Sequence, residues 1–266
     1  MTALRDRAAF RSAYDEAMRR WPPGTEAADL PSAFGPTRVY SCGPADGRPV
    51  LLLSAYGATS LEWNALAHDL AADHRVHAVD VPGDPGGSVA DGPPIDTPER
   101  MRAWLTGVLD GLGRPSAHLV GHSYGAWIAL DLALHGSADG RTDGATGGSG
   151  RVSGLTLLDP TMCFAPLVKS YIFRATPVMM RPSGERRTGL IRWETRGVPL
   201  NQDWLTLTAP TAAVFAGRGR VNPARSAARR AAARSPLISP HVLPDASHYG
   251  LPMTHPQQIA ALVRGG

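Results

Sequence analysis

The sequence predicts an α/β fold, with a mostly parallel central sheet and helices on both of its faces. Short apolar runs, each of the length of a buried strand, alternate along the chain with segments of helical periodicity. That alternation is typical of βαβ units, which build parallel sheets covered by helices. The length agrees with it, because 266 residues suit a single α/β domain that carries an insertion.

The strands are expected where apolar and β-branched residues cluster between turn signals. In chain order they cover residues 37–42, 50–53, 76–81, 117–120, 152–158, 211–216 and 240–243. Between them lie segments with apolar residues at helical spacing. Helices are expected over residues 2–20, from residue 59, from residue 98, over residues 126–134, over the alanine-rich segment 225–234 and from about residue 256.

Two helix starts carry capping signals. Thr59 and Glu62 have the spacing of a capping box, in which the glutamate side chain would reach back to the backbone of the cap residue. Thr97 precedes Pro98, as an N-cap residue does when proline takes the first helical position. These signals fix where the two helices on either side of the second parallel strand should begin.

One segment breaks the alternation of strands and helices. Residues 161–207 are interpreted as a small cap inserted into a core domain that comprises residues 1–160 and 208–266. Residues 1–24 are expected to form an N-terminal helical extension of that core. Residues 136–150 are rich in glycine, serine, aspartate and threonine without periodicity, which favours a flexible surface loop.

Composition argues against several classes of protein. The net charge of +4 would suit a nucleic-acid binder. The arginines, however, are spread among acidic residues, and those of 225–234 favour a solvated helix face, so we expect no nucleic-acid partner. Cys42 and Cys163 are too few for a disulfide framework or a multi-cysteine metal site. Without a membrane-length apolar run or a readable signal peptide, a cytoplasmic location is expected.

The strongest chemical signal is the G-x-S-x-G pattern at residues 121–125. A predicted strand runs straight into it and an apolar helix follows. A sharp strand-to-helix turn needs small residues on both sides of its central residue, because backbone segments approach closely there. Such a turn would project the hydroxyl of Ser123 above the carboxyl edge of the sheet, which predicts a nucleophilic serine.

Together with this pattern, four further segments resemble the α/β-hydrolase family in order, from about Val39 to the C-terminus. They are residues 51–63, 79–88, 157–160 and 247–248. The Phe34-Gly35 turn and the Gly-Asp-Pro-Gly stretch at 83–86 are most similar to bacterial carboxylesterase-type members. The resemblance implies a serine hydrolase that uses no metal and no organic cofactor.

A serine nucleophile needs a base, and the base needs an acid that holds it in the right tautomer. The resemblance implies His248 as the base, since it follows the last strand and precedes the last helix. The acid departs from the family pattern, because Arg220 occupies its usual place and an arginine cannot accept a hydrogen bond. Asp159, at the end of the preceding strand, is favoured instead; Asn222, or no acid at all, stays open.

The resemblance also implies where an oxyanion would bind. One donor is the backbone N–H of Tyr124, directly after the nucleophile, and the second is the backbone N–H of Tyr56 in the loop after the first parallel strand. His122 is interpreted as a packing neighbour whose side chain points away from the serine hydroxyl. The cap is expected to supply an apolar substrate pocket. Its candidate lining residues are Met162, Phe164, Tyr171, Met179 and Trp193.

The sequence therefore predicts a serine hydrolase that cleaves a carboxylic ester, lactone or thioester of a largely apolar small molecule through an acyl-enzyme on Ser123. Two alternatives stay open. One is a lyase, cyclase or C–C bond hydrolase on the same fold, suggested by the displaced acid and the altered oxyanion loop. The other is a catalytically idle member that binds a ligand. The sequence leaves substrate identity and oligomeric state open.

Overall fold

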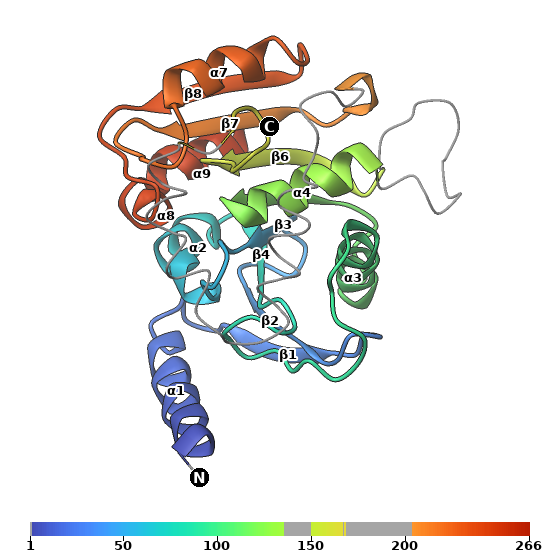
Figure 1. The fold of residues 1–266 in the computed structure, drawn as a ribbon. Coiled ribbons are helices and arrows are strands. Elements are labelled where there is room, and N and C mark those ends of the chain that lie inside the picture. The colour runs from blue at the N-terminus through green and yellow to red at the C-terminus, as the bar shows by residue number, and fades with distance from the viewer. Residues whose placement is uncertain (1, 136–149, 167, 169–203) are drawn as a thin grey trace.

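A computed structural model of the chain describes residues 2–135, 150–166, 168 and 204–266. Within these residues, eight strands form one sheet in the order β1-β2-β4-β3-β5-β6-β7-β8. Strands β3 to β8 run parallel to one another, while β2 pairs antiparallel with both β1 and β4. The predicted α/β fold with a mostly parallel sheet is confirmed (Figure 1).

Every predicted strand, and every predicted helix start in the described residues, corresponds to an observed element within a few residues. The strands are β1 (Glu26–Leu30), β2 (Thr37–Cys42), β3 (Arg48–Leu53), β4 (His74–Val79), β5 (Ala117–His122), β6 (Val152–Leu158), β7 (Thr211–Ala216) and β8 (Ile238–Leu243). The helices are α1 (Thr2–Met18), α2 (Asn64–Leu70), α3 (Pro98–Gly111), α4 (Tyr124–His135), α7 (Ala224–Ala232), α8 (Leu251–Thr254) and α9 (Pro256–Arg264), with 3-10 turns η1 (Ser60–Trp63) and η2 (Trp204–Thr206).

Strand β1 was not predicted, because its sequence Glu-Ala-Ala-Asp-Leu has neither β-branched residues nor an apolar face. Its side chains are exposed apart from the half-buried Leu30. The strand forms through backbone pairing with β2, in which Asp29 lies opposite Arg38. Those two side chains form a bidentate ion pair, with donor–acceptor distances of 2.6 and 2.8 Å. Pairing with a neighbour has therefore overridden a weak strand propensity.

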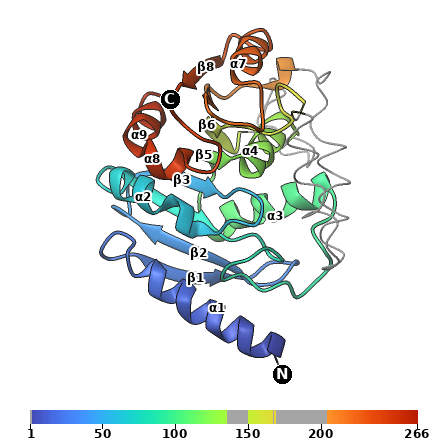
Figure 2. The same ribbon diagram turned by 60° about the vertical axis from the view of Figure 1, so that its left-hand side comes forward.

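The sheet separates two apolar cores. Because side chains alternate along a strand, Leu51 and Leu53 of β3 pack into one core and Val50 and Leu52 into the other. The first core contains buried residues of α3, α4 and α7, and the second contains residues of α1, α2 and α9. Figures 1 and 2 show these helices on the opposite faces of the sheet.

The N-terminal helix is tied to the core by a buried carboxylate. Asp80, directly after β4, is 2% exposed. Its Oδ2 accepts hydrogen bonds from the Tyr14 hydroxyl and the Gly87 N–H, both at 2.7 Å. Its Oδ1 accepts from the N–H and the hydroxyl of Ser60 at 2.9 and 2.8 Å. One side chain thus joins α1, the start of η1 and the loop after β4, and Figure 2 shows α1 beside β1 and β2.

Two buried histidines make the fold sensitive to acid. Burial lowers the pKa of His77 to about 4, and burial likewise lowers the pKa of His118 to about 4. In the unfolded chain both would titrate near 6.5. Between about pH 6.5 and pH 4 the unfolded state therefore binds more protons, so the free energy of unfolding falls as the pH falls through that window.

We expect urea-unfolding free energies to decrease from pH 6.5 to pH 4, by up to about 3 kcal/mol for each of the two histidines. His77 Nδ1 contacts the Ser41 hydroxyl at 2.8 Å, and His118 Nε2 contacts the Thr156 hydroxyl at 2.9 Å. His77→Asn and His118→Gln keep a polar partner for these hydroxyls and remove the ionisation. In each variant the free energy of unfolding should fall less steeply between pH 6.5 and pH 4 than in wild type. If neither variant changes this slope, the two histidines are not its cause.

Three further findings bear on the sequence predictions. None of the helices in the described ranges is both long and apolar enough to cross a membrane. Cys42 and Cys163 are both buried. Most of the predicted cap at residues 161–207, and nearly all of the predicted loop at residues 136–150, lie outside the described residues.

Candidate active site

The turn between β5 and α4 holds Ser123 in a left-handed backbone conformation. Its φ is 53°, and its N–H donates to Leu158 O at 2.8 Å. The glycines on either side are required by close backbone contacts. A Cβ at Gly121 would lie 2.3 Å from Gly125 O, and one at Gly125 would lie 2.0 Å from Leu53 O. The G-x-S-x-G pattern thus forms the predicted sharp turn, at the carboxyl end of a central strand.

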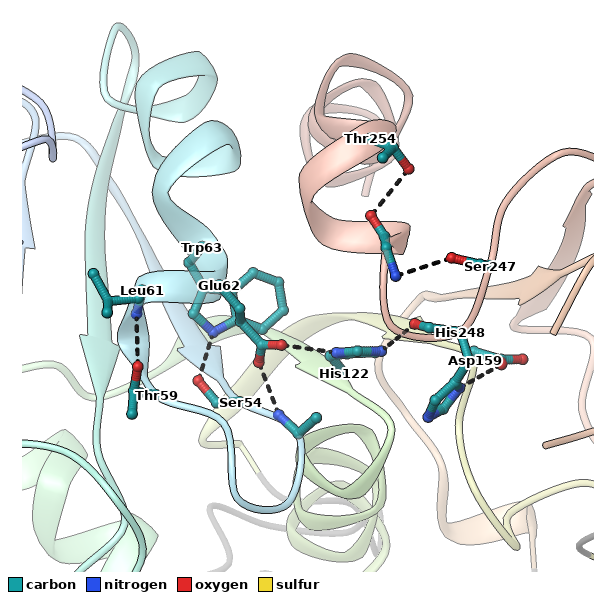
Figure 3. A network of polar contacts seen from close by, with 12 residues as sticks. Ser54, Thr59, Leu61, Glu62, Trp63, His122, Asp159, Ser247, His248 and Thr254 are labelled. Carbon is teal, nitrogen blue, oxygen red and sulfur yellow. Dashed lines mark hydrogen bonds and ion pairs between the residues drawn. The ribbon is translucent and has the colours of Figure 1, made fainter. Parts of the chain in front are cut away.

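His248 and Asp159 meet beside this turn. His248 Nδ1 lies 2.6 Å from Asp159 Oδ2, and the two residues are 4% and 1% exposed. Since a carboxylate accepts, Nδ1 carries the proton, which leaves the lone pair of Nε2 as the basic position of the ring. Figure 3 shows the two side chains pointing toward one another from the loops after β8 and β6. The structure therefore brings the predicted base and the favoured acid together.

Asp159 is held by donors on its other oxygen. Oδ1 accepts from Ala216 N–H at 3.3 Å and from Asn222 Nδ2 at 3.4 Å. The backbone at Asp159 also takes a positive φ, of 41°. Asn222, the alternative acid of the sequence analysis, thus donates to Asp159, while its own Oδ1 accepts no hydrogen bond from His248 or another described residue. Its amide NH₂ also contacts the carbonyls of Asp159 and Pro160, at 3.4 and 3.3 Å.

No hydrogen bond links the Ser123 hydroxyl to His248 or to another described residue. Ser123 itself is 8% exposed. Catalytic hydrogen bonds are often long or poorly aligned in substrate-free sites and tighten when substrate binds. Ser123 follows β5, Asp159 follows the neighbouring strand β6, and His248 lies in the loop after β8. Because these strands are parallel, their carboxyl ends lie along the same edge of the sheet, and the topology brings the three residues together.

The loop after β3 lies against the start of α4. The rings of Tyr56 and Tyr124 pack edge to face with centroids 6.2 Å apart. Two hydrogen bonds join this loop to η1. Trp63 Nε1 donates to the Ser54 hydroxyl at 3.0 Å, and Ala55 N–H donates to Glu62 Oε1 at 2.8 Å. The two predicted oxyanion residues are therefore neighbours, on elements that are fixed to one another.

The capping-box prediction for Thr59 and Glu62 is half right. The Thr59 hydroxyl accepts from Leu61 N–H at 3.3 Å and caps η1 as expected. Glu62 does not reach back to the cap. Its carboxylate contacts Ala55 N–H and His122 Nδ1, the latter at 2.9 Å. Glu62 therefore contacts a distant partner in place of the expected local one, because the His122 ring is buried and costly to leave without a partner, whereas Thr59 is only half-buried.

His122 is more than a packing neighbour. It is 1% exposed, and its Nε2 lies 2.8 Å from the backbone carbonyl of His248. Both ring nitrogens therefore have partners, one on η1 and one on the loop of the candidate base. Sequence reasoning missed Glu62 and this role of His122; the signal available was an acidic residue at a helix start close to the oxyanion loop.

The predicted substrate-contact residues have different outcomes. Phe164 is fully buried, with ring centroids 5.4 Å from Trp204 and 6.0 Å from Phe215, which places its side chain in the core. Met162 is half-buried and has a φ of 60°. The remaining candidates, Tyr171, Met179 and Trp193, lie outside the described residues. Across the described part of the chain, no three His, Cys, Asp or Glu side chains gather as a metal site.

A mostly parallel sheet with a strained serine turn at one strand end, and a histidine–aspartate pair at later ones, defines the architecture of α/β hydrolases. The chain belongs to the alpha/beta hydrolase family, whose model matches residues 50–262. Carboxylesterase YbfK of Bacillus subtilis (strain 168) is 31% identical over 125 residues, which cover 47% of this chain and 42% of that protein. The aligned stretch thus spans less than half the length of this curated relative.

Solved structures agree over nearly the whole fold. The crystal structure of carboxylesterase CesB (YbfK) from Bacillus subtilis superposes with a TM-score of 0.80 at 21% identity, covering 97% of this chain and 98% of that one. The naproxen esterase (carboxylesterase NP) from the same organism gives a TM-score of 0.78 at 20% identity and covers 96% of both chains. At these identities the likeness establishes the fold.

Proposed function

We propose that the chain is a serine hydrolase that cleaves a carboxylic ester, lactone or thioester of a largely apolar small molecule. Ser123 is the nucleophile, His248 the general base and acid, and Asp159 the acid that orients the histidine. The backbone N–H groups of Tyr56 and Tyr124 are the oxyanion donors. Residues 161–207 are proposed as the cap over the site, and the cytoplasmic location stays a prediction.

The observation that carries this proposal is the 2.6 Å contact between His248 Nδ1 and Asp159 Oδ2. It leaves the imidazole with its basic nitrogen available, and it gives a charged partner to the imidazolium that forms when the serine proton is taken. Burial of both side chains lowers the local dielectric and strengthens that interaction. An acid is therefore available in spite of Arg220 at the usual place, which removes the main motive for a non-hydrolytic reaction.

The proposed reaction has two steps, acylation of Ser123 and hydrolysis of the acyl-enzyme. Ser123 Oγ forms a bond to the substrate carbonyl carbon while its proton passes to His248 Nε2, and the carbonyl π electrons become the oxyanion held by the Tyr56 and Tyr124 amides. The oxyanion collapses, the carbon–oxygen or carbon–sulfur bond breaks, and the leaving group takes the proton from His248. Water repeats the sequence on the acyl-enzyme, which releases a carboxylic acid and restores Ser123.

The substrate class rests on two kinds of support. Relatives named as carboxylesterases cover part of the sequence, and structures named as esterases cover almost all of the fold. The residues proposed for the pocket are mostly apolar, as small-molecule sites commonly are. A backbone oxyanion hole places few demands on the leaving group, so esters and thioesters are both proposed.

The proposal is tested by labelling the folded protein with a fluorophosphonate, which reacts with activated serines. Wild type should label, and Ser123→Ala should not. Ser239→Ala, which replaces an exposed serine on β8, should label like wild type. Hydrolysis of p-nitrophenyl butyrate should follow the same pattern. If the wild type neither labels nor hydrolyses esters or thioesters while folded, the catalytic proposal is wrong and ligand binding becomes the better hypothesis.

A further inference from the structure

A continuous chain of hydrogen bonds joins three parts of the proposed site (Figure 3). Ala55 N–H donates to Glu62 Oε1 at 2.8 Å, Glu62 Oε2 lies 2.9 Å from His122 Nδ1, and His122 Nε2 lies 2.8 Å from His248 O. We call the two side chains in the middle, Glu62 and His122, the bridge. They come from η1 and from the end of β5.

The contacts of the bridge specify its protons. A carbonyl oxygen can only accept, so His122 Nε2 must carry a hydrogen. Glu62 Oε1 likewise accepts from a backbone N–H. One further proton therefore lies between Glu62 Oε2 and His122 Nδ1, either as an imidazolium–carboxylate pair or as a neutral pair. In both forms each polar atom of the bridge has a partner.

The bridge is largely shielded from solvent. The side chains of His122 and Glu62 are 1% and 11% exposed. Breaking a buried polar contact leaves a partner unsatisfied, which is more costly than losing an exposed one. The loop partners consequently keep their positions relative to the bridge, and a surface pair would not hold them in this way.

The bridge lies next to three proposed catalytic groups. Its contact Ala55 precedes Tyr56, a proposed oxyanion donor, and its own member His122 precedes the nucleophile Ser123. Its other contact is the backbone carbonyl of the proposed base, whose ring is held separately by Asp159. The proposed base is thus held by two hydrogen bonds, one to its side chain and one to its main chain.

We propose that Glu62 and His122 are positioning residues that fix the oxyanion loop and the base loop in register with Ser123. This inference rests on the proposed function. Rigid positioning matters because a shift of about 1 Å in a reacting group can lower the rate about 10²-fold. Without the Glu62 carboxylate, the Ala55 N–H and the His122 ring each lose the partner that orients them.

The test compares substitutions at Glu62. Glu62→Ala should lower kcat for p-nitrophenyl butyrate by about 10- to 100-fold while KM changes by less than about threefold, because the loss concerns alignment in the transition state. Glu62→Gln should restore kcat to within about fivefold of wild type. A glutamine can accept from Ala55 N–H and donate to Nδ1 of a neutral His122, so both contacts survive without the charge.

A matched control distinguishes a positioning role of Glu62 from a role in stability alone. Thr59→Ala removes the cap of the same helix start but leaves the contacts of Glu62 in place. It should lower the melting temperature and keep kcat within about twofold of wild type. If Glu62→Ala does not fold, Glu62→Asp takes its place: it keeps the charge but is one methylene shorter, so it cannot span both partners and should lower kcat about tenfold.

The outcomes are distinguishable. Wild-type kcat in a folded Glu62→Ala or Glu62→Asp overturns the inference, as does a loss of kcat in Glu62→Gln equal to that in Glu62→Ala. Neither result touches the proposed function, which depends on loss of labelling in Ser123→Ala. If Ser123→Ala retains full activity, the proposed function fails first, and the bridge has no nucleophile to position.

Discussion

Replacing Asp159 with asparagine is expected to lower kcat about 10⁴-fold while the protein stays folded. The local contacts explain why the amide cannot substitute for the carboxylate. Oδ1 of Asp159 faces two donors, Ala216 N–H and Asn222 Nδ2. An amide would turn its oxygen toward these donors and its NH₂ toward His248 Nδ1. The ring would then hold its proton on Nε2, and the base would face Ser123 with a hydrogen in place of a lone pair.

Steady-state kinetics with p-nitrophenyl butyrate and a melting curve test this prediction together. Asp245→Asn is the matched control, because Asp245 lies three residues before His248 and is 71% exposed, with its contact to His255 at 3.3 Å. It should leave kcat within about twofold of wild type. A large loss of kcat in Asp245→Asn, with nearly normal kcat in Asp159→Asn, would show that Asp245 and not Asp159 is the acid.

The fold could be predicted largely because the strands from β2 to β7 are buried on both faces. Apolar runs such as that of β3 stand out against the polar turns that bound them, and a slip of one residue would exchange the two cores. Strand β1 could not be found in this way. Its residues are exposed and mostly unsuited to strands, and it exists only because β2 offers an edge with which to pair. That information is not local to residues 26–30.

The candidate site shows the same division between local and distant causes. The serine turn is encoded by two glycines in contiguous sequence, and the histidine by its place after the last strand. The order of elements and the arginine at the usual acid position pointed to Asp159, while its contact to His248 crosses 89 positions of sequence. Glu62 was misassigned because a local motif explained it well, although its partner His122 lies 60 positions away. A local motif does not show whether a distant residue such as His122 offers Glu62 a better partner than the helix cap does.

Replacing Gly125 with alanine is expected to lower the free energy of unfolding by about 3 kcal/mol or more and to abolish fluorophosphonate labelling. A Cβ there would lie 2.0 Å from Leu53 O, 2.5 Å from Leu53 C and 2.8 Å from Ser54 O. These are backbone atoms at the end of β3, so no side-chain rotation can relieve the contact. The oxyanion loop and the start of α4 would have to separate, which displaces the Tyr56 amide from Ser123. Because natural domains are stable by only about 5–15 kcal/mol, we expect a fraction of the Gly125→Ala protein to be recovered unfolded.

Gly107→Ala provides the matched control for this substitution. Gly107 lies in α3, and a Cβ there would meet nothing within 4 Å. Alanine is favoured over glycine in a helix by about 0.5–1 kcal/mol, so Gly107→Ala should be slightly more stable than wild type and should label normally. Urea unfolding and labelling of the soluble fractions measure both effects. If Gly125→Ala matched wild type in stability and in labelling rate, the close packing of the serine turn against β3 would be contradicted, and with it the argument that this contact sets the distance between the nucleophile and the oxyanion loop.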